Sequence, residues 1–347
     1  MTHRSRAPPQ SSQLPPRPKS ARVKTPKKLH HPPPANAAAS ASISSTSVLP
    51  AHLATPSDAD VLLLIRKALL PTLTSPDFLS RIQKIKTLLY DKKWLEVFNS
   101  GNEGMLDVYA GRWVPSRAIG FRSLLGSLEG LRKAFGWEEE AQAEGSEKRK
   151  VISLGGGAGS ELLAVAALVK ASQPFSCEWV GIDIGDWSRT LSKFEDTIRE
   201  EWSLPSETLA VEYIKADLLS SDVLASHLTP SSPSSTLLTL LFTLTELFAQ
   251  SRAATLSLLA RITQLSAPGT LFLVADSASD ISHFALGAEG REYPIFMILD
   301  MVLIGRQGGW EVVEEEDSRW FRLGEEGREW ECKLENLRCW FRLYRRL

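Results

Sequence analysis

The chain has 347 residues, 43% of them hydrophobic, which is enough apolar material for a sizeable α/β core in one or two domains. The formal net charge of −1 conceals an asymmetry, because residues 1–57 carry eight Lys or Arg and no Asp or Glu, leaving −9 for the remainder. No apolar run is long enough for a membrane helix, and the N-terminus lacks the hydrophobic stretch of a signal peptide. The three cysteines lack CxxC spacing, so we expect neither disulfides nor a metal site. We therefore expect an intracellular protein with no membrane partner.

Residues 1–57 are rich in Pro, Ser and Ala and lack periodic apolar residues, so we expect a disordered basic tail. Its basic cluster, Arg22 to Lys28, is compatible with a nuclear import signal, with a phosphate-binding arm, or with a solvated linker that has no partner. If the cluster is a nuclear import signal, the protein is expected in the nucleus or nucleolus. If it is only a solvated linker, a cytoplasmic location is also compatible with the sequence.

Residues 58–137 have a helical pattern. Asp58 is placed to cap a helix over residues 61–70, and an amphipathic helix begins near Asp77. In residues 109–117, cations alternate with aromatic rings, which suits contact with nucleotides and equally suits an ordinary packed loop. A further amphipathic helix is expected from about 118 to 135, followed by a charged linker over 138–150.

Residues 151–347 alternate between strands and helices, which predicts a parallel α/β sheet with crossover helices. We expect strands at 151–154, 178–183, 209–214, 236–243 and 270–276. Helices are expected near 160–171, 188–202, 219–227, 251–265 and 291–304. Two alternating aromatic runs, 319–323 and 339–343, predict an antiparallel pair that closes the sheet. In the absence of a strong exposed apolar stripe, a monomer is expected.

The first strand of this sheet runs into a glycine-rich turn that opens a helix. Gly155, Gly156, Gly157 and Gly159 lie in this turn, at the carboxyl edge of the sheet where doubly wound folds bind ligands. A dinucleotide fingerprint requires G-x-G-x-x-G/A, but its sixth position is Ser160, whereas the shorter G-x-G-x-G is satisfied. The spacing favours S-adenosylmethionine over NAD.

Two further strand ends supply the other parts of a nucleoside pocket. Asp183 ends the second strand, where a carboxylate can accept the ribose hydroxyls, and Asp217 ends the third, where it can accept the adenine amino group. The backbone N–H of Leu218 can contact the ring. Glu161 either faces the amino acid moiety of the cofactor or favours the N-terminus of its own helix.

Acidic residues after the fourth and fifth strands are candidates for contacting the molecule that accepts the methyl group. The fourth lacks both the Asn/Asp-Pro-Pro-Tyr motif of amino-methylating enzymes and a cysteine for covalent attack on a pyrimidine, which leaves Glu246 as the polar group. Glu246 either accepts a proton or caps the next helix. Asp276 offers a second carboxylate near the same cleft.

Five segments together resemble the fungal family of 25S ribosomal-RNA uridine-N3 methyltransferases. The segments are residues 152–161, 241–248, 276–278, 293–294 and 335–338, within a resemblance that covers roughly residues 58–347. It implies a Rossmann-like class I methyltransferase fold that uses S-adenosylmethionine, with ribosomal RNA or a pre-ribosomal particle as partner. The implied reaction is methyl transfer to N3 of a uridine.

The implied chemistry requires that the imide proton of N3 leave before or during an in-line displacement. The resemblance makes Glu246 the first candidate for accepting it and Asp276 the second, with an ordered water as another acceptor. Because N3 lies on the Watson–Crick edge, the base must be unpaired or extruded.

Arginines beside aromatic residues are the candidates for holding the RNA backbone and stacking on bases. The arginines are Arg112, Arg117, Arg319 and Arg322, and the neighbouring aromatic residues are Trp113 and Trp320. Packing and surface solvation explain these arginines nearly as well.

Three alternatives stay open. A methyltransferase of a protein or small-molecule acceptor would use the helical region to cover its substrate. A non-catalytic ribosome-assembly factor could retain the fold, although it would not require Gly155, Gly157, Asp183 and Asp217 together. An NAD-linked oxidoreductase is disfavoured by the loop spacing and by the 28 residues between Gly155 and Asp183, where that motif expects about 20.

Overall fold

The computed structural model describes residues 49–98, 104–137, 149–172, 176–220, 222–228, 236–278, 283–286, 291–305 and 308–347. All of them belong to one compact unit, Ser44–Leu347. Most of the predicted basic tail and of the linker over 138–150 lies outside the described residues. Within the described residues, no helix combines the length and apolarity needed to cross a membrane.

The main sheet has seven strands in the order β3-β2-β1-β4-β5-β9-β8. β1 to β5 are parallel, and β9 runs antiparallel to both β5 and β8. This arrangement confirms the predicted Rossmann-like sheet with a C-terminal antiparallel pair. The strands are β1 (Arg149–Leu154), β2 (Cys177–Asp183), β3 (Leu209–Lys215), β4 (Thr236–Leu241), β5 (Leu271–Ser277), β8 (Trp310–Phe321) and β9 (Leu337–Arg346).

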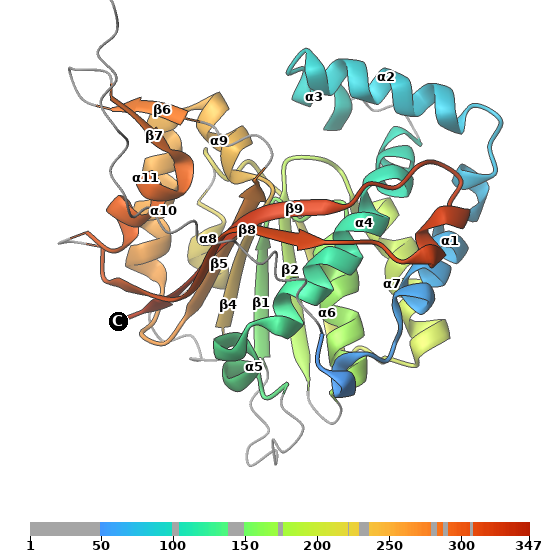
Figure 1. Cartoon of the computed structure of the whole chain (residues 1–347), viewed down its shortest axis with the longest axis horizontal. Coiled ribbons are helices and arrows are strands. Elements are labelled where there is room, and N and C mark those ends of the chain that lie inside the picture. Colours follow the sequence, from blue (N-terminus) through green and yellow to red (C-terminus); the bar gives the residue numbers. More distant parts are fainter. Residues whose placement is uncertain are drawn as a thin grey trace, which may run out of the picture. The chain divides into compact units, whose positions relative to one another are not determined.

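Helices cover both faces of the sheet (Figure 1). One face carries α1 (Asp58–Leu73), α4 (Met105–Ser127), α6 (Ser160–Ala171) and α7 (Ser188–Trp202). The other carries α8 (Leu224–His227), α9 (Leu244–Gln250), α10 (Arg252–Leu265) and α11 (Ile295–Leu303). Alternate strand residues point to opposite faces, so Val151 packs with the first group and Ile152 with the second. Both faces of β1, β2, β4 and β5 are therefore largely buried, as parallel sheets require, whereas the edge strand β3 is only partly buried.

The remaining elements are peripheral. They are η1 (Ala51–Leu53), α2 (Phe78–Tyr90), α3 (Trp94–Phe98), α5 (Glu129–Phe135), η2 (Glu325–Glu329) and a separate two-stranded sheet of β6 (His283–Leu286) and β7 (Arg291–Pro294). The helix predicted over 291–304 begins only at Ile295, because Pro294 has no N–H and takes an extended conformation at the N-cap. The helix predicted over 219–227 is reduced to α8.

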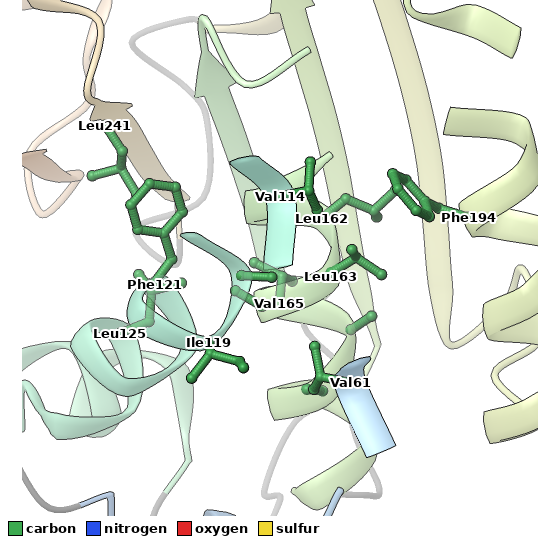
Figure 2. Packing of buried hydrophobic residues seen from close by; sticks show 14 of the residues in the cluster. Val61, Val114, Ile119, Phe121, Leu125, Leu162, Leu163, Val165, Phe194 and Leu241 are labelled. Atoms are coloured by element: carbon green, nitrogen blue, oxygen red, sulfur yellow. The ribbon is translucent and has the colours of Figure 1, made fainter. Parts of the chain in front are cut away.

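α4 packs along α6 and joins the N-terminal helices to the sheet. Figure 2 shows Val114 of α4 next to Leu162 of α6 and the Phe121 ring pointing toward Leu241, all within one buried cluster. The helices of residues 58–137 thus share a hydrophobic core with the sheet.

The N-terminus of α1 is capped by Ser57, where Asp58 was predicted. Ser57 Oγ accepts from the Asp60 N–H at 3.2 Å, and the Ser57 N–H donates to Asp60 Oδ2 at 2.7 Å, which completes a capping box. Asp58 is instead 3.2 Å from Nη1 of Arg122, a side chain that is 2% exposed. This ion pair partly compensates the buried positive charge of Arg122.

The segment over residues 109–117, weighed as a loop, is helical. Pro115 lies inside α4 and removes the N–H that would bond the carbonyl oxygen of Gly111. The indole N–H of Trp330 donates to that oxygen at 2.9 Å, across 219 residues of sequence. A distant side chain therefore supplies the hydrogen bond that the proline removes, and the helix continues.

Residues 335–338, one of the segments that carry the resemblance, attach the C-terminal pair of strands to α4. Arg112 Nη2 lies 2.7 Å from Glu335 Oε1. A Cβ on Gly120 would lie 2.6 Å from Cδ2 of Leu337, so the glycine permits this close approach. Arg338 Nε donates to Ser318 Oγ at 2.8 Å, linking β9 to β8.

Candidate active site

A cavity of about 490 Å³ lies where β1 to β4 end. Its walls come from the glycine loop, from the residues after β2, β3 and β4, from α4, and from the short helix α3. This volume is in the range of small-molecule sites, and its position is where doubly wound sheets bind ligands. Of the predicted cofactor and catalytic residues, Gly155, Asp183, Asp217, Leu218 and Glu246 line it.

The glycine loop brings bare backbone to this cavity. Gly155 has φ +81°, and a Cβ there would lie 2.5 Å from the side chain of Thr243. A Cβ on Gly157 would lie 2.1 Å from Cδ1 of Trp187. Gly159 has φ +88° at the N-cap of α6. The left-handed conformation at Gly155 and Gly159 and the close approach at Gly157 require residues without a side chain.

Asp183 is the acceptor at the centre of the predicted nucleoside pocket. Its Oδ1 accepts from the Gly185 N–H at 2.9 Å and from the Trp187 indole N–H at 3.0 Å, and its Oδ2 accepts from the Gly157 N–H at 3.1 Å. Burial raises the pKa of Asp183, and these three donors lower it in part. The carboxylate also lines the cavity, where its oxygens can accept from a ligand hydroxyl.

Asp217 and Leu218 lie at the neighbouring strand end. Asp217 Oδ1 accepts from the Leu219 N–H and Oδ2 accepts from Ser220 Oγ, each at 2.9 Å, so the carboxylate stabilises its own turn. Leu218 is 5% exposed and contributes an apolar wall.

Glu161 and Gly156 do not line the cavity, and they pack beneath the glycine loop against the ends of β1 and β4. Glu161 Oε2 accepts from Thr239 Oγ1 at 3.2 Å, and a Cβ on Gly156 would lie 2.1 Å from Oγ of Ser153. Burial raises the pKa of Glu161 to about 8, and the Thr239 hydrogen bond lowers it in part. Glu161 therefore carries a proton at neutral pH.

Glu246 lies in the first turn of α9, beyond the end of β4, and faces the cavity together with Arg117 of α4. Burial raises the pKa of Glu246 to about 7, with Arg117 opposing and the carboxylates of Asp276 and Asp183 adding to the rise. Arg117 Nη1 donates to the Tyr109 hydroxyl at 3.0 Å. The strand predicted to reach residue 243 ends at Leu241, which is why Glu246 is helical.

Asp276 does not line the cavity. Its Oδ2 accepts from the Thr245 N–H at 2.9 Å and its Oδ1 from the Ser277 N–H at 2.8 Å. Burial raises its pKa, while these amides lower it. Its observed contact is with the first turn of α9, the turn that carries Glu246.

The predicted RNA-contacting residues are dispersed. Arg117 lines the cavity, and the Trp113 ring stacks on Tyr109, another lining residue, with 4.6 Å between ring centroids. Arg319 Nε donates to Glu316 at 2.8 Å, and its guanidinium lies over the Phe341 ring. The remaining two are Arg112, buried against Glu335, and Arg322, which lines a second cavity beside Trp320.

Two aromatic residues and α3 complete the cavity without having been singled out from the sequence. Trp187 is 1% exposed and packs on Phe98 of α3 and on Tyr109. Phe242 has φ +58°, a conformation that costs a bulky side chain energy, and its ring lies 5.6 Å from the Arg117 guanidinium carbon. The strained backbone of Phe242 lies at the cavity wall, and no sequence pattern reveals that strain.

The strand order, the glycine loop after β1 and the buried acid after β2 define a doubly wound enzyme fold that binds a nucleotide-like cofactor. The chain belongs to a family of SAM-dependent methyltransferases, whose sequence model matches residues 65–345. The protein is thus an S-adenosylmethionine-dependent methyltransferase, and the NAD-linked alternative is excluded.

A relative from Saccharomyces cerevisiae, the 25S rRNA (uridine(2843)-N(3))-methyltransferase, is 29% identical, with the match covering 76% of this chain and 77% of the relative. Among solved structures, a mutant 16S rRNA (adenine(1408)-N(1))-methyltransferase from Catenulisporales acidiphilia matches with a TM-score of 0.34 and 15% identity, covering 62% of this chain and 91% of that one. A SAM-dependent methyltransferase from Aquifex aeolicus matches with a TM-score of 0.33 and 15% identity, covering 66% and 98%.

The residues of the cavity fit S-adenosylmethionine. Gly155 brings backbone without a side chain to the cavity wall, and the Asp183 carboxylate lies beside it as a hydrogen-bond acceptor. The volume suits a nucleoside with an amino acid attached.

Proposed function

We propose that the protein methylates N3 of a uridine in large-subunit ribosomal RNA. The yeast relative named above acts on this atom in 25S rRNA, and the match extends over most of both chains. The observation that carries the proposal is that a partly buried carboxyl, Glu246, and a partly buried guanidinium, Arg117, line the same cavity as the glycine loop.

In this proposal the pocket holds the cofactor through the glycine loop and the strand ends. Gly155, Gly156, Gly157 and Gly159 let the backbone approach it, Asp183 accepts one ribose hydroxyl, and Asp217 and Leu218 bound the adenine. Bound S-adenosylmethionine supplies an electrophilic methyl group. Asp276 holds the first turn of α9 and so positions Glu246.

The uridine imide has a proton on N3 and no usable lone pair, so a base is required. Glu246, with its pKa near 7, is divided between its two protonation states at neutral pH and accepts this proton as the bond from N3 to carbon forms. As the proton leaves, negative charge develops on N3 and on the two carbonyl oxygens of the base, where Arg117 at the cavity wall stabilises it until the bond to the methyl carbon forms.

A direct test is methyl transfer from labelled S-adenosylmethionine to large-subunit ribosomal RNA from cells that lack the protein, with nucleosides separated and identified by mass spectrometry. We expect N3-methyluridine. Label in protein or in a small molecule, with none in RNA, would identify the alternative methyltransferase class. Binding of the cofactor without any transfer would favour the assembly-factor alternative.

The role of Glu246 is tested by Glu246→Gln, with Glu200→Gln at an exposed position of α7 as the control. Because a base must be ionised, wild-type turnover rises with pH through about 7. Glu246→Gln loses this limb and lowers turnover by roughly 10²–10⁴, while its affinity for S-adenosylmethionine is unchanged. An unaltered pH profile would exclude Glu246 as the base.

The finer organisation also stays a proposal. We infer a nuclear or nucleolar protein, since a ribosomal RNA substrate is made there, and a monomer. The division of the chain into a tail (1–57), a helical region (58–137), a linker (138–150) and a methyltransferase domain (151–347) is retained as a prediction.

A further inference from the structure

Residues 78–98, which comprise α2, its connection and α3, form an arm at the end of the molecule where the parallel strands finish (Figure 1). The arm reaches the catalytic cavity with its second half. Lys92, Lys93, Trp94, Leu95 and Phe98 all line that cavity. A molecule whose reacting atom enters the cavity therefore meets this arm at the entrance.

The arm carries a net positive charge, whereas residues 58–347 as a whole are acidic. Residues 78–98 contain five Lys or Arg and two Asp or Glu, whereas residues 58–347 as a whole carry a net charge of −9. Lys84, Lys86 and Lys92 are exposed, and within the described ranges none of them lies in an ion pair. Cations without a protein partner on an otherwise acidic surface are suited to a polyanion.

Lys92 occupies a backbone position that favours glycine. The Lys93 N–H donates to the Leu88 carbonyl and the Lys92 N–H to the Leu89 carbonyl, which together form a Schellman end to α2. The C′ residue of this motif is left-handed and is usually glycine, yet here it is Lys92 with φ +57°. The chain thus places a lysine side chain at the cavity in a conformation that costs energy and that glycine would adopt freely.

The arm also exposes large apolar side chains beside these lysines. Tyr90 is 88% exposed, and Leu79 and Leu95 are each 59% exposed. Phe78, Ile82 and Ile85 form the opposite, buried face of α2. Aromatic and apolar surface between cations is the usual composition of a site for unpaired nucleic acid, where bases stack and phosphates pair.

We propose that the arm binds the unpaired RNA on either side of the target uridine, with Lys92 paired to a phosphate next to the nucleotide that enters the cavity. Lys84 and Lys86 continue the contact along the strand, and Tyr90 stacks on a base. This inference rests on the proposed function, because it assumes an RNA substrate. It assigns RNA contact to the arm, in addition to Arg117 inside the cavity.

Lys92→Gly provides a test in which folding and RNA binding respond differently. Glycine relieves the left-handed strain, so we expect a Tm no lower than that of the wild type, together with weaker RNA binding. The probe is a fluorescein-labelled oligouridylate of about 16 nucleotides, the upper site size of common single-strand-binding folds. Anisotropy gives its Kd over a series of salt concentrations, and calorimetry gives the affinity for S-adenosylmethionine.

The triple variant Lys84→Ala, Lys86→Ala, Lys92→Gly extends the test to the whole arm. Each lost phosphate contact reduces the salt dependence by about 0.7 in log Kd per log salt, so the triple variant loses about 2. We expect a Kd at least about tenfold weaker at moderate salt, with the affinity for S-adenosylmethionine unchanged. The control is Lys133→Ala with Arg328→Ala, two exposed cations on α5 and η2.

The outcomes separate this inference from the proposed function. Wild-type binding that the triple variant retains would overturn the arm as the RNA site while leaving an RNA substrate in place. An equal loss in the Lys133 and Arg328 control, or a lost affinity for S-adenosylmethionine in the arm variants, would also overturn it. Failure of the wild type to bind any oligouridylate would overturn the arm as a site for unpaired RNA, while the proposed function would still be decided by methyl transfer to ribosomal RNA.

Discussion

Glu161→Gln is predicted to stabilise the protein increasingly as the pH rises. Glu161 is 2% exposed beneath the glycine loop, and burial raises its pKa from 4.5 to about 8. The folded state therefore retains a proton that the unfolded state releases above its own pKa. Glutamine has nearly the same shape and accepts the Thr239 hydrogen bond without titrating.

The magnitude follows from linkage. For an acid whose pKa is raised by folding, the unfolded state binds fewer protons between the two pKa values, so the free energy of unfolding falls as the pH rises through that window. The slope reaches about 1.4 kcal/mol per pH unit, and the window runs from 4.5 to about 8. From about pH 5 to about pH 8, the advantage of Glu161→Gln over the wild type should grow by an amount on the order of 3 kcal/mol.

The assay is urea unfolding monitored by tryptophan fluorescence at several pH values for the wild type, Glu161→Gln and Glu200→Gln. Glu200 is an exposed residue of α7 and provides the matched control. A constant difference between Glu161→Gln and the wild type at every pH would refute the reasoning, because it would mean that Glu161 is ionised in the folded protein.

Three shorter predictions concern the scaffold and the cofactor pocket. Trp330→Phe keeps the packing but leaves the Gly111 carbonyl without its donor; chemical denaturation should record a loss of about 1–3 kcal/mol, and an unchanged stability would mean that water replaces the indole. Gly157→Ala places a methyl group 2.1 Å from the Trp187 ring, so calorimetry should detect little S-adenosylmethionine binding, and wild-type affinity would contradict the proposed loop contact. Ser57→Ala removes the cap of α1 and should cost about 1 kcal/mol in the same denaturation experiment; no loss would show that the helix end needs no cap.

The sheet and the cofactor side of the site were predictable because their signals are local. The alternation of apolar strands with helices predicted the sheet. Gly155 to Gly159 together with Asp183 predicted the edge of the sheet at which the cavity lies, because a turn that requires glycine and an acid at a strand end are each visible in a few consecutive residues. The C-terminal antiparallel pair was equally visible from its two aromatic runs.

The remainder depends on contacts that the sequence does not reveal. Pro115 suggests the end of a helix, and its effect is reversed by Trp330, a partner far along the chain. In the sequence, Asp276 and Glu246 are both acidic residues that follow a strand, and their roles cannot be told apart. In the structure, Asp276 accepts a hydrogen bond from Thr245 in the first turn of α9, whereas Glu246 lines the cavity. No propensity rule places a lysine such as Lys92 in a backbone conformation that favours glycine. The sequence therefore predicted a helix in the arm but did not predict that the arm is part of the site.

The bond between Trp330 and Gly111 also constrains the order in which the protein can mature. A ribosome releases Gly111 long before Trp330, and β9, which completes the sheet beside β5, comes later still. Until Trp330 has emerged, the Gly111 carbonyl has no side-chain donor, and the cavity wall that α4 forms rests on an incompletely bonded helix. The N-terminal helices can therefore begin to pack during synthesis, but the methyl-transfer site reaches its final form only once Trp330 and β9 have emerged from the ribosome.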